Sequence, residues 1–590
     1  MNEIKRHKRF TVVIGNPPYS VSSWNTGVWS TNLAEDYKRT VRAEESQIQS
    51  LSNDYIKFLR FGEWHIERTN AGILGLITGH GYLSGTQPRD LRNHVSASFD
   101  RCYCLDLHGS VRRAGTHDSE DEPVFEIMTG VAIFLGFRAI SHQQRATTIL
   151  ESLTGRLEKK FAFLRDHNAL KTSLGGNAHS PFAPYFYFAA AATAQDISEE
   201  YEHCPDLPAI FGTGNRQADK EMFWATGFAS QQDELAMSFT REELEGKMTT
   251  LANSRSFDEL RASYRLCTTN QWDYSEAKEF AKRGLWKQHV GQVLYRPFDR
   301  QWTVLHKHVL TILRKQVMSQ LGGRERNLGL VSSRAVNDLS FAHCFVTNEP
   351  VDKIFISSKT STNAYVFPLF FRDDDMFGKK RRPNFSRAFL TLLAEKLAIT
   401  KTSEHGLPAG LTPEDIFQYA YAVFHSPRYR SRYAEFLKID FPRLPLTGNL
   451  ELFRELSRLG GELVALHLLE SPKLDTPITE FIGSSREVTK VGYTDETVWI
   501  NAGGTKAKTT AGTSGFQGVP EAVWNFHIGG YQVCEKWLKD RKGRTLTDED
   551  IAHYHKIVIS LSETIRLMAE IDQVIESHGG WPGAFAGDAK

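Results

Sequence analysis

Four consecutive residues near the start of the chain, Asn16-Pro17-Pro18-Tyr19, combine side chains that suit one kind of chemistry. They directly follow the run Phe10–Gly15, whose apolar and β-branched residues are typical of a buried strand in a parallel sheet. Because two successive prolines end both strands and helices, a stiff loop must begin at this point. Ligands in open α/β sheets bind outside the carboxyl ends of the strands, which is where this loop would lie.

The residue types in this loop favour methylation of an exocyclic amine on a nucleobase. The lone pair of such an amine is delocalised into the ring, so a site that methylates it needs acceptors for both amino hydrogens. The side-chain oxygen of Asn16 and the backbone carbonyl of Pro17 can supply them, and the two prolines hold them in place before the base arrives. Tyr19 offers a ring face on which a base flipped out of the duplex can stack. The alternative is a rigid turn that only closes a strand, but the position directly after the apolar run favours the methylation site.

The segments that must position this loop alternate between strands and helices up to about residue 145. The spacing of apolar residues predicts a helix within Gln47–Glu67, with Asn53 or Ser52 as its start signal. Such alternation indicates an α/β layer with a largely parallel sheet. The other predicted elements are strands at Gly72–Thr78, Cys102–Leu107, Val124–Met128 and Val131–Leu135, and a helix at Pro88–Val95.

The rest of the chain mixes helices with segments rich in aromatic residues, glycine and proline. The clearest predicted helix is Thr547–Ile575, whose apolar residues recur every three or four positions and which Thr547 or Asp548 can cap. Asn501–Gly518 is rich in Gly, Thr, Ala and Lys, which predicts a loop or a hairpin tip. Further helices are predicted at Leu157–Leu170, Ala189–Glu200, Asp258–Arg265, Phe385–Leu397 and Pro413–Leu437.

The composition excludes several classes of protein. Of the 590 residues, 41% are apolar and 24% are charged, which excludes a disordered, fibrous or membrane-embedded chain. The six cysteines form no CxxC pairs, and no apolar segment follows the basic residues of Met1–Phe10. We therefore expect a cytoplasmic protein without a disulfide framework or a zinc ribbon, and we assign no metal ligands. The net charge of +1 does not by itself indicate a nucleic-acid partner.

The segment FTVVIGNPPYS resembles motif IV of the amino-group (N6-adenine) DNA methyltransferases. The likeness continues in GILGLITG at Gly72–Gly79, in FDRCYCLDLHG at Phe99–Gly109 and in VFEIMTGVAIFL at Val124–Leu135. The remainder is similar to the target-recognition region of single-chain Type I (Type ISP) and Type IIG restriction–modification proteins. The segments that carry this second likeness are Val293–Trp302, Tyr419–Leu446 and Val523–Asp540.

The resemblance implies a function. The methyl donor would be S-adenosylmethionine, the partner double-stranded DNA, and the catalytic loop Asn16, Pro17, Pro18 and Tyr19. The reaction would be site-specific methylation at adenine N6 in a restriction–modification or related defence system; the residue types alone leave cytosine N4 open, since it is also an exocyclic amine. Basic and aromatic residues of the C-terminal half would contact DNA. The candidates are Arg296, Arg300, Trp302, Arg314, Lys379, Lys380, Arg381, Arg382, Arg428 and Arg430.

The resemblance also implies a fold. It is α/β, with a partial Rossmann-like methyltransferase sheet that begins at the fourth strand, joined to a large α+β target-recognition region. We expect three domains. Residues 1–145 would be the C-terminal half of the catalytic domain, residues 146–450 the target-recognition region, and residues 451–590 a specificity subdomain that ends in a long helix.

A cofactor-binding half is not recognisable in the sequence. In the family, a Phe-x-Gly-x-Gly turn that cradles the donor precedes motif IV, whereas here only nine residues precede the strand. The best downstream candidate, Phe211–Gly214, lacks this spacing. We therefore expect either a companion chain that carries the cofactor-binding half or a truncated gene, and weak or no binding of S-adenosylmethionine by the chain alone.

Two further activities have no motif in the sequence. There is no GxxxxGK[ST] phosphate loop and no convincing cluster of metal-nuclease residues, so a translocase or nuclease would also belong to a companion chain. The competing hypothesis for the chain as a whole is a DNA-specificity module, or a fragment, without catalysis of its own.

Overall fold

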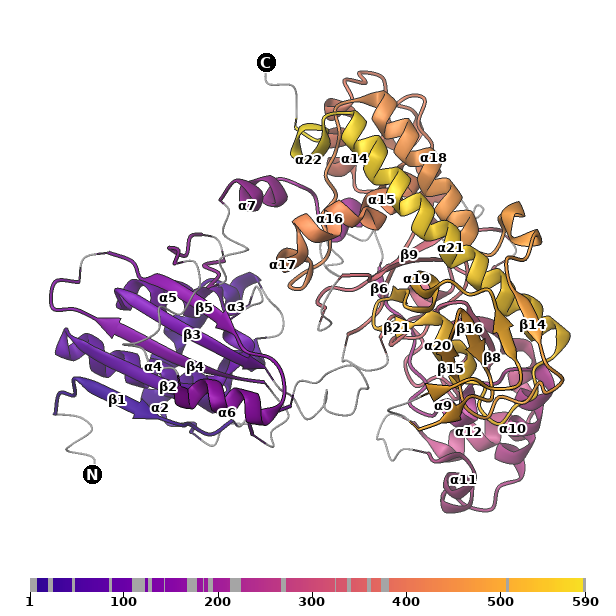
Figure 1. Ribbon diagram of the computed structural model, residues 1–590, viewed down its shortest axis with the longest axis horizontal. Coiled ribbons are helices and arrows are strands. Elements are labelled where there is room, and N and C mark those ends of the chain that lie inside the picture. Colours follow the sequence, from indigo (N-terminus) through magenta and orange to yellow (C-terminus); the bar gives the residue numbers. More distant parts are fainter. Residues whose placement is uncertain are drawn as a thin grey trace. The chain divides into compact units, whose positions relative to one another are not determined.

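The computed structural model describes residues 8–19, 25–44, 48–83, 87–108, 122–125, 130–142, 144–166, 178–183, 185–188, 195–212, 224–266, 272–323, 325–336, 341–357, 362–372, 381–505 and 509–586. The chain forms two compact units (Figure 1). The N-terminal unit comprises Met1–Tyr201 with Lys438–Asp440, and the C-terminal unit comprises Glu202–Leu437 with Phe441–Lys590. Each unit has a hydrophobic core of its own.

The N-terminal unit is built on a five-stranded sheet. Strands β1 (Val12–Gly15), β2 (Gly72–Gly79), β3 (Arg101–His108) and β5 (Thr147–Ser152) run in one direction, and β4 (Val131–Arg138) runs against them, between β2 and β3. The sheet is therefore mixed. Our prediction of a largely parallel sheet is confirmed for the four strands that share a direction and is wrong for β4, because apolar runs do not specify strand direction. Since four strands share a direction, the carboxyl ends of β1, β2, β3 and β5 still meet at one edge of the sheet, which we call the carboxyl rim.

Helices cover one face of this sheet. Helix α4 (Asp54–Thr69) begins at Asn53, as predicted, because the Asn53 side chain accepts a hydrogen bond from the Tyr55 backbone amide. Residues of α4 and of α5 (Arg89–Ser98) form the core with the inward side chains of the strands. The remaining helices of this unit are α2 (Val28–Ala34), η1 (Glu35–Lys38), α3 (Val41–Glu44), η2 (Gln49–Ser52), η3 (His80–Tyr82), α6 (Leu157–Asp166) and α7 (Gln195–Glu202).

The other face of the sheet is exposed near β1. We predicted a buried strand at Phe10–Gly15; the strand is confirmed, but its burial is wrong, because β1 is at the sheet edge. Val12 and Ile14 are 60% and 84% exposed, whereas Val13 between them packs against the core. Ile73 on β2 pairs with both Val12 and Phe137 on β4, and Ile73 and Phe137 are also exposed. These four side chains, Val12, Ile14, Ile73 and Phe137, form what we call the β1 apolar face.

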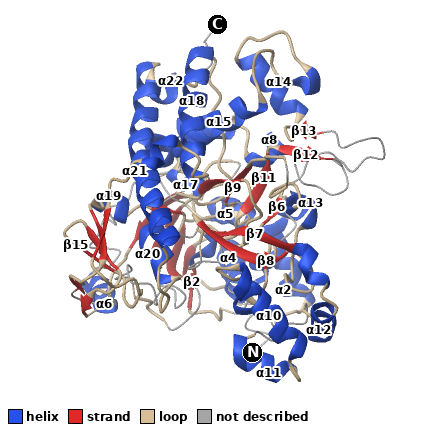
Figure 2. Ribbon diagram, turned by 90° about the vertical axis from the view of Figure 1, so that its right-hand side faces the viewer, coloured by secondary structure: helices blue, strands red, loops and turns tan. Residues whose placement is uncertain are grey.

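The C-terminal unit combines several small sheets with helices (Figure 2). A hairpin of β7 (Val290–Arg296) and β8 (Asp299–Val304) turns at Pro297 and Phe298. One four-stranded sheet has the order β10 (Cys344–Thr347), β9 (Gly329–Ser332), β11 (Tyr365–Pro368), β6 (Ala225–Thr226), and the other the order β14 (Glu480–Ile482), β19 (Gly515–Gln517), β16 (Thr497–Trp499), β15 (Gly492–Thr494). The remaining strand pairs are β12 (Phe370–Arg372) with β13 (Arg381–Pro383), β17 (Gly503–Gly504) with β18 (Thr509–Thr510), and β20 (His527–Ile528) with β21 (Tyr531–Gln532).

Among the helices of this unit, α21 (Asp548–Ser577) is the longest described. It begins at Thr547, as predicted, with a capping box between Thr547 and Asp550. The predicted helix Pro413–Leu437 is divided into three where Pro427 ends the first. The other helices are α8 (Leu207–Phe211), α9 (Asp233–Ala236), α10 (Arg241–Asn253), α11 (Phe257–Tyr264), α12 (Tyr274–Lys282), η5 (Leu285–His289), α13 (Lys315–Met318), α14 (Arg387–Lys396), η6 (Glu404–Gly406), α15 (Pro413–His425), α16 (Pro427–Arg432), α17 (Ala434–Leu437), α18 (Leu450–His467), η7 (Pro472–Asp475), α19 (Glu521–Trp524), α20 (Val533–Lys539) and α22 (Gly580–Gly583).

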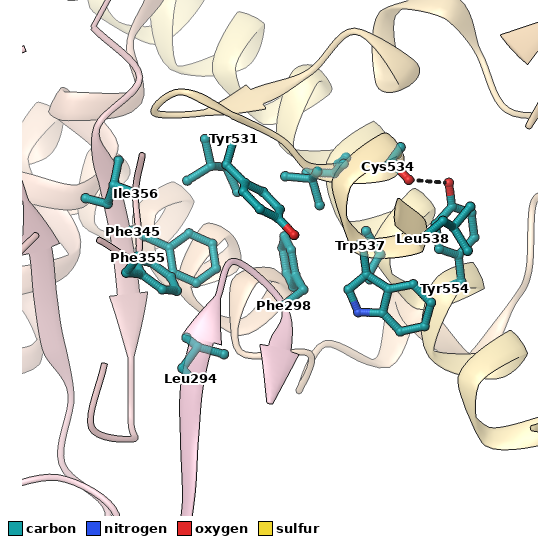
Figure 3. Close-up of a cluster of buried hydrophobic side chains, with 14 of the residues drawn as sticks. Leu294, Phe298, Phe345, Phe355, Ile356, Tyr531, Cys534, Trp537, Leu538 and Tyr554 are labelled. Atoms are coloured by element: carbon teal, nitrogen blue, oxygen red, sulfur yellow. Dashed lines mark hydrogen bonds between the residues drawn. The ribbon is translucent and has the colours of Figure 1, made fainter. Parts of the chain in front are cut away.

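The main core of the C-terminal unit joins segments that are far apart in the sequence (Figure 3). Leu294 and Phe298 of the β7–β8 hairpin pack in one cluster with Tyr531 and with Trp537 of α20. In the same cluster, the Tyr554 hydroxyl of α21 donates a hydrogen bond to the backbone carbonyl of Cys534, 3.0 Å away. Two of the three segments that carry the family likeness in this half therefore share one core. None of the described helices is long and apolar enough to cross a membrane.

Candidate functional site

The Asn16–Tyr19 loop lies at the carboxyl rim of the N-terminal sheet, directly after β1. Asn16 is exposed, Pro17 is buried and Tyr19 is half-buried. The Tyr19 hydroxyl lies 3.1 Å from Asn16 Oδ1 and 3.1 Å from the backbone carbonyl of Ile77 at the end of β2. One hydroxyl thus connects the Asn16 amide to the neighbouring strand and limits how the loop can move.

The ring of Tyr19 rests on an aromatic column in the core. Its centroid lies 6.1 Å from that of Tyr55, which in turn lies 6.4 Å from that of Tyr82. Burial raises the pKa of Tyr19 to about 12, so the hydroxyl keeps its proton at neutral pH and acts as a donor. Asn16 Oδ1 has a second lone pair, which leaves it able to accept a hydrogen bond from an incoming amine.

Two histidines and an aspartate lie on the same rim, and the sequence analysis assigned them no role. His80 follows β2, and Asp106 and His108 end β3. His80 Nδ1 lies 3.1 Å from Asp106 Oδ1, and His108 Nδ1 lies 3.5 Å from Asp106 Oδ2. Burial alone would raise the pKa of Asp106, but the hydrogen bond from His80 and the charges of both histidines bring it below its ordinary value. Polar residues at the carboxyl ends of two strands that run in the same direction, β2 and β3, were the signal that could have revealed this group.

A network of charged side chains joins the helices that cover the sheet, and its role is structural. Glu63 is fully buried, accepts a 2.6 Å hydrogen bond from the Tyr37 hydroxyl, and lies 2.9 Å from His94 Nδ1. Arg60 reaches Glu63 and also pairs with Asp36. Burial would raise the pKa of Glu63, but His94, Arg60 and Tyr37 lower it, so the carboxylate stays charged and holds α4 against η1 and α5.

Two of the predicted DNA-contacting arginines are directed into the C-terminal unit. Arg296 is 5% exposed, forms a 2.8 Å ion pair with Asp352, and stacks on the Tyr295 ring. Arg430 donates to the backbone carbonyl of Phe424 at 2.8 Å, and burial lowers its pKa. A buried guanidinium that already has partners favours a structural role for both residues rather than a contact with phosphate.

Other candidates of this set lie at the surface or partly buried. Arg314 is exposed and donates to Thr226, Arg381 is exposed and stacks on Phe370 at 3.6 Å, and Arg428 is exposed and pairs with Glu576. The Arg300 side chain is 37% exposed and lies 3.1 Å from Glu349, while Trp302 and Arg382 are half-buried. Lys379 and Lys380 lie outside the described residues.

A cavity of about 280 Å³ lies in the C-terminal unit, beside α15 and α18. Arg454, Arg458 and Asp415 contribute its charged lining. Arg458 is already paired with Glu455 and Glu462, so its charge is neutralised within the protein. This cavity includes none of the residues predicted to act in catalysis.

Two family models match different parts of the chain. Residues 222–570 match the family model described as the Type ISP C-terminal specificity domain. Residues 1–109 match the one described as the Eco57I restriction-modification methylase. No curated protein matches the chain.

Three solved structures share the fold over nearly the whole chain. The first is the ATP-dependent Type ISP restriction-modification enzyme LlaBIII bound to DNA, at 18% identity, TM-score 0.67, covering 97% of this chain and 37% of that one. The second is a nuclease-deletion mutant of the Type ISP enzyme LlaGI in complex with a DNA substrate mimic, at 18% identity, TM-score 0.65, covering 95% and 52%. The third is the DrdV–DNA complex, at 19% identity, TM-score 0.65, covering 96% and 57%. The chain thus spans between 37% and 57% of the length of these proteins.

Proposed function

The chain belongs to the Type ISP C-terminal specificity domain family, and from this premise we propose that it is the catalytic-loop and specificity portion of a restriction–modification DNA methyltransferase. The methylase match of residues 1–109 supports a DNA methylation and recognition role. We propose further that the reaction is methylation of adenine N6 in double-stranded DNA by S-adenosylmethionine.

One observation carries this proposal: Asn16 is exposed at the carboxyl rim, and its amide oxygen is oriented by the Tyr19 hydroxyl at 3.1 Å. In the proposed reaction Asn16 Oδ1 and the Pro17 carbonyl accept the two hydrogens of the amine, which directs the nitrogen lone pair toward the donor. Pro18 stiffens the loop, and the face of the Tyr19 ring turned away from Tyr55 stacks on the flipped base.

The described residues do not offer the turn that would hold S-adenosylmethionine. The only strand before Asn16 in the described part of the chain is β1. In the candidate at Phe211–Gly214, Phe211 is the last residue of α8 rather than a residue after a strand, and residues 213–214 lie outside the described residues. We therefore assign the donor site to a polypeptide segment outside the described residues, and we give the described residues only the base-holding part of the reaction.

The β1 apolar face supports such a segment. Its four side chains, of which Ile14 is 84% exposed, would be costly to leave in water, and β1 is also a sheet edge with free backbone groups. We propose that a polypeptide segment with the cofactor-binding half covers this face and extends the sheet beyond β1. We retain as proposals the domains 1–145, 146–450 and 451–590 and the surface DNA contacts at Arg300, Trp302, Arg314, Lys379, Lys380, Arg381, Arg382 and Arg428.

The test is methyl transfer to DNA of mixed sequence by the full chain, alone and with a companion that carries a Phe-x-Gly-x-Gly strand–turn–helix. Tritium from labelled S-adenosylmethionine is followed, and the digested nucleosides are separated. We expect N6-methyladenine, formed only with the companion. Asn16→Ala should lower the rate at least about 100-fold, because it removes an acceptor that acts in the transition state. Asn32→Ala, the same change on exposed α2, is the matched control and should have no effect.

The second candidate function is a DNA-specificity module without turnover, favoured by the family match that covers only residues 222–570. Sequence-specific DNA binding without methylation under every combination of companion and donor would establish it and would refute the methyltransferase proposal. N4-methylcytosine as the product would retain the reaction class and refute the adenine assignment.

A further inference from the structure

The carboxyl rim carries a group of side chains that the proposed methylation does not use. His80, Asp106 and His108 each offer one ligand atom, and these atoms all lie within 4.8 Å of one another. We propose that these three residues bind one divalent transition-metal ion of the Zn²⁺ type. The proposal rests on their geometry alone and does not require the methylation to be correct.

The distances between the ligand atoms suit a single ion. His80 Nδ1 and Asp106 Oδ1 are 3.1 Å apart, and His108 Nδ1 and Asp106 Oδ2 are 3.5 Å apart. Around Zn²⁺, with bonds of about 2.1 Å, neighbouring ligand atoms lie about 3.0–3.4 Å apart in octahedral or tetrahedral geometry. The two pairs use different oxygens of Asp106, and the three ligand atoms lie within 4.8 Å of one another, so binding requires side-chain rotations that draw them together around the ion.

The backbone of β3 brings its two ligands together. The pairing of β3 with β4 shifts register between Asp106 and His108, and His108 has a φ of 49°, which is uncommon for a residue other than glycine. In this turn Asp106 Oδ1 also accepts a 2.8 Å hydrogen bond from the His108 backbone amide. Such irregularities redirect side chains at strand ends, and strained positions of this kind concentrate at functional sites.

The third ligand is fixed by contacts with the start of β4. The His80 backbone amide donates to the Gly130 carbonyl at 3.0 Å. The His80 ring lies directly over Gly130, where a Cβ atom would come within 2.6 Å of its Cε1 atom. Glycine at this position therefore lets the imidazole approach Asp106.

The three side chains are accessible without being fully exposed. His80, Asp106 and His108 are 33%, 14% and 27% exposed, which leaves one side of the group open to water. Three protein ligands with an open position are typical of zinc sites that keep a bound water. Two histidines with one carboxylate select transition ions over Mg²⁺ and Ca²⁺, which prefer oxygen ligands.

A second cluster of histidine and carboxylate side chains differs from this one because it already contains a positively charged partner. Glu63, Glu67 and His94 also bring three ligand atoms together. There, however, Arg60 lies 3.4 Å from Glu63 and 3.1 Å from Glu67. A guanidinium group already supplies the positive charge that an ion would bring, so we propose no ion at that cluster.

The test is titration of the full chain with Co²⁺, followed by its visible absorption, and with Zn²⁺, followed by calorimetry and by competition with Co²⁺. We expect one equivalent of either ion to bind and Mg²⁺ not to compete. Asp106→Asn and His80→Gln should each weaken Co²⁺ binding at least tenfold. His142→Gln is the matched control, because His142 forms a 2.9 Å pair with Asp100 at the opposite end of β3, without a second histidine in that pair.

Two outcomes would overturn the proposal: no saturable Co²⁺ absorption, or binding that survives both substitutions. Circular dichroism checks that each variant is folded. If either variant does not fold, the melting temperature of the unaltered chain serves instead, since it should rise with Zn²⁺ and fall back with a chelator. In that case Gly130→Ala, which displaces His80, should reduce the Zn²⁺-dependent rise, and an unchanged rise would refute the site.

Discussion

At the residue scale, one hydroxyl group orients the proposed catalytic loop. The Tyr19 hydroxyl has a single proton and two acceptors at 3.1 Å, the Asn16 side chain and the Ile77 carbonyl. Because burial raises the pKa of Tyr19 to about 12, that proton is present throughout the physiological range. The Asn16 amide is therefore oriented by a neutral donor whose effect does not vary with pH near neutrality.

Replacing Tyr19 by phenylalanine should separate the role of the hydroxyl from that of the ring. The ring can still pack on Tyr55, so we expect the free energy of unfolding to fall by only about 1 kcal/mol, the usual contribution of one hydrogen bond. The rate of methyl transfer should fall about tenfold, because Asn16 loses the donor that orients it. Tyr103→Phe on β3 is the control; an equal loss of activity in both variants would contradict this role for Tyr19.

A second residue-scale prediction concerns a buried ion pair in the C-terminal unit. Arg541 lies 2.7 Å from Asp299 and stacks on Trp537, and the side chains of Arg541 and Asp299 are 8% and 0% exposed. Arg541→Ala should lower the free energy of unfolding by about 3 kcal/mol, because it leaves a buried carboxylate without its cation. Adding Asp299→Asn to this variant should restore part of the loss in urea titrations. Strictly additive effects would show that the two side chains do not interact.

At the element scale, we expect the β1 apolar face to promote self-association of the chain. Ile14 and Val12 are outward residues of an edge strand, so changes there remove exposed apolar area without disturbing the core. Ile14→Thr with Val12→Thr should reduce self-association, measured by light scattering, and leave the melting temperature nearly unchanged. Leu74→Thr, on the covered face and fully buried, should instead lower it by several degrees. Unchanged self-association in the double variant would mean that another surface is responsible.

The sequence predicts elements well where the signal is local. Asn53 and Thr547 start their helices as expected because a cap needs only the next three residues. The direction of β4 and the exposure of β1 could not be predicted, because both depend on which strands are neighbours. His80 and Asp106 are 26 residues apart in the sequence, and only the parallel course of β2 and β3 brings them to one rim.

The same limit applies to the DNA-contact candidates. Sequence reasoning can find arginines in basic segments, but it cannot separate Arg296, which pairs with Asp352, from Arg314, which is exposed. The ion pair joins residues 56 positions apart, so its acidic partner is not visible in the local sequence. The position of the Asn16–Tyr19 loop was easier to predict because its strand, prolines and polar residues are consecutive.

At the scale of the whole molecule, buried histidines make stability depend on pH. Burial and then the charge of Arg430 lower the pKa of His467 to about 3, and burial lowers the pKa of His425 well below its ordinary value. Both are neutral when folded: His467 accepts a hydrogen bond from the Tyr421 hydroxyl, and His425 donates to the Tyr421 carbonyl. In the unfolded chain both would titrate near about 6.5.

The sign of the effect follows from these directions. As the pH falls below about 6.5, the two histidines take up protons in the unfolded chain but not in the folded chain. Their contribution to the free energy of unfolding is therefore fully present above that pH and is lost progressively toward pH 3. Each histidine contributes up to about 1.4 kcal/mol per pH unit in that range. Urea unfolding of the C-terminal unit at pH 7.5, 6 and 5 should show this decline, and His467→Gln should reduce its slope. Stability that is constant over this range would contradict the prediction.

Helix α21 affects the cooperativity with which the C-terminal unit unfolds. Its 30 residues extend for about 45 Å. Its first half, with Tyr554 and Val558, shares a core with the strands β16 and β19, while Ser426 at the start of α16 donates to Asp572 in its second half. One continuous helix thus packs on both the β16–β19 region and the α16 region. Neither region can unfold without disrupting its contacts with this helix. The parts of the unit that α21 joins should therefore denature together in one cooperative step, and a protease that cuts within α21 would destabilise both at once.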